Sequence, residues 1–69
     1  MEIRFTEKAT AALSLAKERA SQTGCDYIGT EHILLGILLE GTNVASKILE
    51  DHSVSVEMME AAIAETMGD

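Results

Sequence analysis

The fold is decided by a stretch near the middle of the chain, Ile28-Gly29-Thr30-Glu31-His32-Ile33-Leu34-Leu35-Gly36-Ile37-Leu38-Leu39. Thr30 is a good N-terminal capping residue, and the acid directly after it, Glu31, suits the positive end of a helix dipole. The apolar run that follows stops at Gly41, and glycine commonly ends helices. We therefore predict a helix over residues 30–40.

This helix should lie at the centre of the molecule. Residues 33–39 are apolar all round, which is typical of a helix that is buried on most of its surface. Gly36 interrupts the run and costs about 1 kcal/mol relative to Ala in a helix. The expected compensation is a close approach by the backbone of another helix.

A longer helix is predicted before the central one, over residues 6–23. Thr6 is a good cap at its start, Glu7 suits the dipole, and Gly24 is placed to end it. One face repeats at helical spacing and carries Ala9, Ala12, Leu13, Ala16 and Ala20. These side chains are small, so a neighbouring helix should pack close to this face.

Two shorter helices are predicted after the central one, over residues 43–52 and 55–67, with Gly68 as the final stop. In the first of them, the residues expected to point inward are Val44, Ala45, Ile48 and Leu49, and those expected to point outward are Ser46, Lys47, Glu50 and Asp51. In the second, the apolar stripe is Val56, Met59, Ala62, Ile63 and Met67. Four helices with short connections predict a compact all-α domain.

The chain has 69 residues, which allows one domain. Size scaling predicts a folded surface of about 4,200 Å², and so small a chain is marginal alone and would gain from association. The single Cys25 excludes an internal disulfide and fits a reducing compartment such as the cytoplasm. No apolar run reaches the roughly 18 residues of a membrane span. We therefore expect a soluble cytoplasmic domain with no membrane partner.

The formal net charge is −7, and the charges are unevenly placed. From residue 48 onward there are six acids and no base. Nucleic-acid binding needs clustered Lys and Arg, and the five bases here are too few and too mixed with acids. The acidic end is either a solvated helix face that keeps the domain soluble or a surface that attracts basic partners.

The residue types that carry catalysis are scarce. His32 lies in the first turn of the central helix, where a packed and hydrogen-bonded role is expected, and His52 suits the negative end of a helix. Cys25 has no evident base beside it, and Asp26 disfavours a thiolate. No metal-ligand spacing, phosphate-binding loop or carrier serine is present. We predict no catalytic residue, no metal and no cofactor, and hence no enzyme.

Two stretches resemble the Clp N-terminal repeat. Phe5-Thr6-Glu7-Lys8-Ala9 is similar to its opening, and the central stretch quoted above is similar to its signature, written roughly I-G-T-E-H-L-L-L-G-L-L. The continuation Glu40-Gly41-Thr42-Asn43-Val44-Ala45 matches its third helix. The resemblance covers the whole chain, residues 1–69, as a single repeat.

The resemblance implies a function. Two such repeats form the N-terminal domain of Clp-family AAA+ unfoldases, where they dock adaptor and substrate proteins for chaperone or proteolytic machines. In some relatives the domain recognises phosphoarginine, and the matching residues here are Glu31 and Thr6. The other interpretation is that Glu31 only complements its helix dipole and Thr6 only caps its helix.

A single repeat departs from the paired pattern of the family. The chain is either half of a longer unfoldase domain, working with AAA+ ATPase modules, or a stand-alone regulatory half-domain that acts by self-association or decoy binding. In both cases we expect a homodimer that imitates the paired repeats, because one four-helix unit can hardly hide its apolar residues. The helix over 6–23 and the helix over 55–67 are the expected contact elements.

Overall fold

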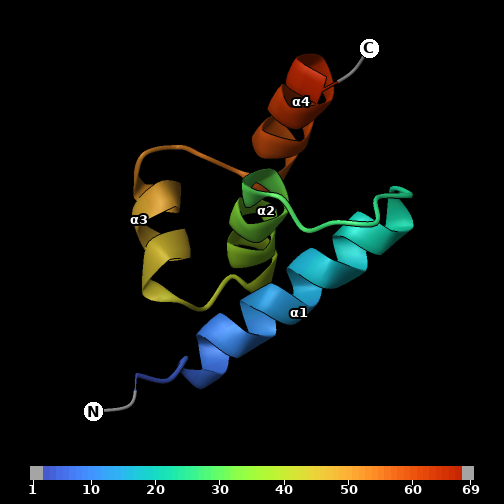
Figure 1. Cartoon of the computed structure of the whole chain (residues 1–69). Coiled ribbons are helices and arrows are strands. Elements are labelled where there is room, and N and C mark those ends of the chain that lie inside the picture. The colour runs from blue at the N-terminus through green and yellow to red at the C-terminus, as the bar shows by residue number, and fades with distance from the viewer. Residues whose placement is uncertain (1–2, 68–69) are drawn as a thin grey trace.

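The computed structural model describes residues 3–67 and places four helices in them (Figure 1). They are α1 (Glu7–Gln22), α2 (Thr30–Glu40), α3 (Val44–Asp51) and α4 (Val56–Met67). The predicted all-α fold is therefore confirmed. The predicted ranges for α1, α3 and α4 are longer because they include capping residues, and the predicted stop at Gly68 lies outside the described residues, as does the side chain of Met67.

The central helix is α2, as the apolar run predicted. It packs against α1, α3 and α4, whereas no other pair of helices has close backbone contacts within residues 3–67. In Figure 1, α4 extends away from the other helices beyond the start of α2. Leu35, Gly36 and Leu38 are buried, but Leu39 remains 39% exposed. Three neighbouring helices thus leave part of α2 uncovered.

The caps explain why the helices begin and end where they do. The predicted cap at Thr30 is wrong, because Gly29 is the N-terminal cap residue of α2 and Thr30 is already its first helical residue. The Thr6 hydroxyl accepts a hydrogen bond from the Ala9 amide at 3.1 Å, as the sequence predicted. Asn43 caps α3, and its side-chain oxygen accepts from the Ser46 amide at 2.7 Å. After α1 the chain reverses at Gly24, whose φ of +79° belongs to the left-handed region that favours glycine.

The small residues of α1 face α2. Ala12, Ala16 and Ala20 are buried, and a Cβ added at Gly36 would lie 3.1 Å from the Ala16 Cβ. The predicted close approach at Gly36 is confirmed. The alanine face of α1 is consequently used inside the chain, which corrects the expectation that it would serve as a dimer contact.

The predicted orientation of α3 is wrong for its apolar side, although its charged residues are exposed as predicted and Leu49 is half-buried. Ser46, expected to point outward, is completely buried, whereas Val44 and Ile48, expected to point inward, are 76% and 54% exposed. The turn between α2 and α3 fixes this rotation, because Asn43 donates to the Ile37 carbonyl at 2.9 Å while capping the helix at Ser46. The Ser46 hydroxyl in turn donates to the Asn43 carbonyl at 2.9 Å.

The molecule is flat and exposes much surface for its size. Its extents are 43 × 31 × 17 Å, and its accessible surface is 5204 Å². That surface is about 1,000 Å² more than size scaling predicts for a folded chain of this mass. In the described part of the chain no single helix could span a membrane, and only α2 and α3 taken together, bent by 89°, have the length and composition to do so.

Candidate functional site

The candidate site is a cavity of about 250 Å³ where the end of α1, the start of α2 and one side of α4 meet. Its apolar lining comes from Leu35, Ile63 and Ala64. Its polar lining comes from Arg19, Thr23, Cys25, Glu31, His32 and Glu60. The cavity therefore combines an apolar wall with two carboxylates and one guanidinium.

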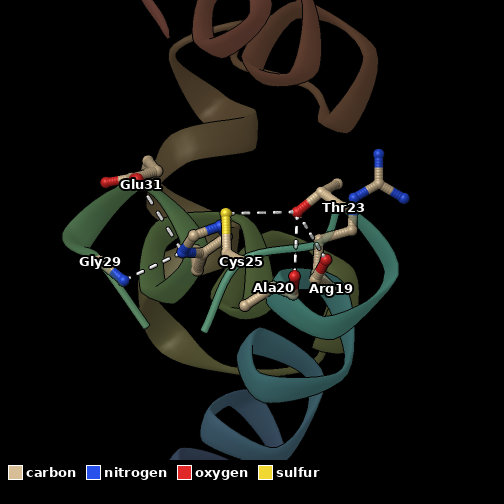
Figure 2. Close-up of polar contacts among 7 residues, drawn as sticks. Arg19, Ala20, Thr23, Cys25, Gly29 and Glu31 are labelled. Carbon is tan, nitrogen blue, oxygen red and sulfur yellow. Dashed lines mark hydrogen bonds and ion pairs between the residues drawn. The ribbon is translucent and has the colours of Figure 1, made fainter. Parts of the chain in front are cut away.

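Glu31 is held at this cavity by the loop before α2. Its side chain is 22% exposed and folds back over Gly29, where an added Cβ would lie 2.5 Å from the Glu31 Oε1 (Figure 2). The absence of a side chain at Gly29 thus makes room for the carboxylate. Because Glu31 also lies in the first turn of α2, its charge favours the positive end of the helix dipole.

His32 stabilises the start of α2. Its ring is buried, and its Nδ1 accepts a hydrogen bond from the Gly29 amide at 2.9 Å, so the predicted packed and hydrogen-bonded role is confirmed. The Glu31 Oε2 lies 3.9 Å from the same nitrogen, and the Tyr27 ring stacks obliquely with its centroid 5.8 Å away. His32 is therefore a structural support beneath Glu31.

The opposite wall of the cavity contains an ion pair between α1 and α4. Arg19 donates to a carboxylate oxygen of Glu60, and each of these side chains is about one-third exposed. The Thr23 hydroxyl is shared between the carbonyls of Arg19 and Ala20, at 3.1 Å from each (Figure 2). Glu60 is thus already paired within the chain, whereas Glu31 has no guanidinium or ammonium partner in the ion pairs of residues 3–67.

The cavity is suited to binding rather than to nucleophilic chemistry. Cys25 and His32 both line it, but the Nδ1 lone pair of His32 is occupied by the Gly29 amide. The Cys25 Sγ lies 3.7 Å from the Thr23 hydroxyl.

Cys25 also raises the pKa of the nearby Tyr27 phenol, with smaller contributions from Glu31 and Asp26, so this phenol stays protonated at neutral pH. Within residues 3–67 no three His, Cys, Asp or Glu side chains gather as a metal site.

Thr6 lies at the other end of α2. Two residues after it, the Lys8 ammonium donates to the Thr42 carbonyl at 2.8 Å, which ties the start of α1 to the turn after α2. Glu31 lies in the first turn of α2, and the 11 residues of that helix separate the two ends by about 15 Å. One chain therefore does not bring the two predicted site residues together.

Comparison with known protein families shows to which family the chain belongs. A family model described as the Clp repeat N-terminal domain matches residues 4–69. The chain belongs to this family. The match confirms the resemblance that the central stretch and the opening of the chain indicated.

The relatives of this Clp repeat are much longer proteins. The ATP-dependent Clp protease ATP-binding subunit ClpA homolog of Porphyra purpurea is 42% identical over 69 residues, which is 100% of this chain and 8% of that protein. Chaperone protein ClpC1, chloroplastic, of Oryza sativa subsp. japonica is 38% identical over 65 residues, 94% of this chain and 7% of that protein. The Clp repeat thus spans less than a tenth of the length of these relatives.

Sequence reasoning found Glu31 in this Clp repeat but missed its surroundings. Arg19 and Glu60 are 41 positions apart, and nothing in local spacing or helical periodicity couples them. The sequence alone also does not show that Gly29 makes room for the carboxylate of Glu31 two positions later. The exposed apolar face of α3 was missed because periodicity identifies a face but does not say which way the face points.

Proposed function

We propose that this Clp repeat is a non-catalytic docking module that binds adaptor or substrate segments through the cavity at Glu31. The observation that carries the proposal is a partly buried carboxylate beside an apolar wall, with no guanidinium or ammonium partner in the ion pairs of residues 3–67. An arginine side chain fits this chemistry, because its guanidinium can bind a carboxylate in a bidentate manner while its aliphatic stem packs on apolar side chains.

Phosphoarginine is the more specific ligand that we propose. Glu31 would bind its guanidinium, and the phosphate would need hydrogen-bond donors at a helix N-terminus. Thr6 caps such a terminus, but in one chain it lies at the far end of α2 from Glu31. Thr6 would therefore join Glu31 at one ligand only if it came from a second repeat or a second copy of the chain.

The setting that we propose is a Clp-type ATP-dependent unfoldase or protease system. In such a system the repeat would capture a protein and present it to AAA+ ATPase modules, either in a parent chain or in a partner. The relatives named above are an ATP-binding subunit and a chaperone, which supports this setting. A cytoplasmic or similarly reducing compartment fits the single Cys25.

Peptide titration tests the site. One peptide would carry phosphoarginine, a second arginine and a third glutamine at the same position, each titrated calorimetrically into wild type, Glu31→Gln and Glu57→Gln. We expect Glu31→Gln to weaken binding of the phosphoarginine peptide at least about tenfold, because a hydrogen-bonded charge contributes about 1.5–3 kcal/mol. Glu57 lies on the exposed first turn of α4 and serves as the matched control. Equal affinity of wild type and Glu31→Gln would contradict the assignment of the site.

A second candidate function is a regulatory half-domain that acts by self-association or as a decoy. Its support is the surface of 5204 Å², larger than expected for a chain of this mass. A decoy should compete with the N-terminal domain of a Clp unfoldase for the same phosphoarginine peptide. Adding the repeat in excess should then slow degradation of a tagged protein by that unfoldase, and an unchanged rate would contradict decoy binding.

A further inference from the structure

The outward side of α3 is an apolar surface that nothing in the described chain covers. Val44 and Ile48 are four positions apart, so they lie on one side of the helix, and they are 76% and 54% exposed. We name these two side chains the α3 face. The exposed Phe5 belongs to the segment before α1, and the Lys8–Thr42 hydrogen bond holds the first turn of α1 beside the start of α3.

The excess surface is large enough to provide one side of a dimer interface. The chain exposes about 1,000 Å² more than a folded monomer of its mass should expose. A standard protein–protein interface buries about 800 Å² on each partner. The excess thus corresponds to one side of one interface of ordinary size.

The charges beside the α3 face favour a second copy of the same chain. In α3 the only base, Lys47, precedes the acids Glu50 and Asp51 at the end of the helix. When two copies of α3 pair in antiparallel fashion about a twofold axis at the α3 face, the acidic end of each copy lies beside the start of α3 in the other, where Lys8 is bound to the Thr42 carbonyl. A twofold interface uses one patch twice, so the patch must be complementary to itself, and α3 meets that condition.

The same requirement of a self-complementary patch argues against α4 as the contact element. Its charged residues are all acids, Glu57, Glu60 and Glu65, so two copies of α4 would repel each other. Met58 offers an exposed apolar side chain there, but it stands between these acids. The alanine face of α1 is already packed on α2.

We propose that the α3 face is the centre of a twofold homodimer interface, formed by antiparallel pairing of α3 with α3 of a second copy. The proposal rests on the self-association that is part of the proposed function and assigns its surface. It does not depend on Glu31, so dimerisation and peptide binding can fail independently. Because each chain carries a charge of −7, the dimer should tighten as added salt screens the repulsion.

Sedimentation of the full chain from micromolar to millimolar concentration, at about 0.15 M salt and at higher salt, tests the proposal. Wild type should reach twice the 7.4 kDa of one chain. Ile48→Glu should raise the dimer dissociation constant at least about 30-fold, because the lost contact counts twice in a twofold interface. Met58→Glu is the matched control, since Met58 is 52% exposed on α4, and its dimer constant should stay within a few-fold of wild type.

A second variant controls for the possibility that a substitution abolishes dimerisation by unfolding the chain. Val44→Glu changes a side chain that is 76% exposed, so helicity and cooperative melting should be retained while dimerisation is lost. A wild-type particle that stays at 7.4 kDa at millimolar concentration would overturn the proposal. The proposal would also be overturned if both α3 variants formed wild-type dimers, or if Met58→Glu alone abolished them.

Discussion

The backbone of Gly36 in α2 lies directly against the carbonyl oxygen of Ala12 in α1. A Cβ at Gly36 would overlap that oxygen and would lie 3.0 Å from the Ala16 amide nitrogen. This approach brings α1 and α2 into close contact. Both neighbours are backbone atoms, so neither can turn aside as a flexible side chain could.

Gly36→Ala should therefore destabilise the protein, although alanine is the better helix former by about 1 kcal/mol. Forcing apart two packed helices costs about 1–3 kcal/mol, and we expect a net loss in the free energy of unfolding measured by urea denaturation. Adding Ala16→Gly should not restore stability, because the carbonyl of Ala12 remains in the way. A variant as stable as wild type would show that α1 and α2 are farther apart.

Gly29→Ala should weaken phosphoarginine-peptide binding without removing any charged group. The added Cβ would occupy the space of the Glu31 carboxylate, only 2.5 Å from Oε1, and so displace it. Stability should fall by about 1 kcal/mol or less, because alanine is a poorer cap than glycine. Calorimetric titration of Gly29→Ala, Glu31→Gln and the double variant provides the check.

The double variant tests whether Gly29 affects binding through the Glu31 carboxylate. Both single substitutions act through the same carboxylate, so their effects on the binding free energy should not add. Fully additive losses would mean that Gly29 contributes to binding by a route of its own.

Glu40 should make stability depend on pH in the acid range. Hydrogen bonds from Thr42, then that from Asn43, hold the pKa of this carboxyl below its ordinary value of 4.5, and Lys8 adds a smaller effect. A carboxyl whose pKa is lowered by folding stabilises the protein above its unfolded pKa and loses that effect as the pH falls through the folded pKa. At neutral pH the contribution is complete.

Glu40→Gln should therefore lower the melting temperature at neutral pH, and its difference from wild type should shrink as the pH falls below 4.5. Glu57→Gln controls for the general effect of removing one negative charge. A difference between Glu40→Gln and wild type that stayed constant down to pH values well below 4.5 would contradict a role for the ionised carboxyl.

Much of the fold could be predicted because its determinants are local. Thr6 caps α1, Gly24 ends it, and Gly36 permits close packing, and each of these effects depends on residue type and helical spacing alone. Glu31 was found through the signature stretch. The Arg19–Glu60 pair could not be predicted, because it depends on how α4 is placed relative to α1.

The rotation of α3 shows a different limit. Val44, Ala45 and Ile48 face away from the chain's own core, and only Leu49 of the four residues predicted to point inward is half-buried. The hydrogen bonds of Asn43 to Ile37 and Ser46 decide the rotation, and they oppose the tendency of Val44 and Ile48 to be buried. A chain that buries such a face against a second copy satisfies both requirements, whereas a pattern read for a monomer assigns the face to its own core.

Two substitutions in α3 test its rotation, because their expected effects on stability are the opposite of those that helical periodicity predicts. Ser46 is completely buried and donates to the Asn43 carbonyl, so Ser46→Leu should overpack the contact with α2 and lower the free energy of unfolding by about 1–3 kcal/mol. Val44 is 76% exposed, so Val44→Ser should change stability by no more than about 0.5 kcal/mol. Both measurements belong at a protein concentration low enough to keep the chain monomeric, since Val44 also belongs to the α3 face. If Ser46→Leu were tolerated and Val44→Ser strongly destabilising, α3 would have the opposite rotation and no apolar face would remain for a second copy.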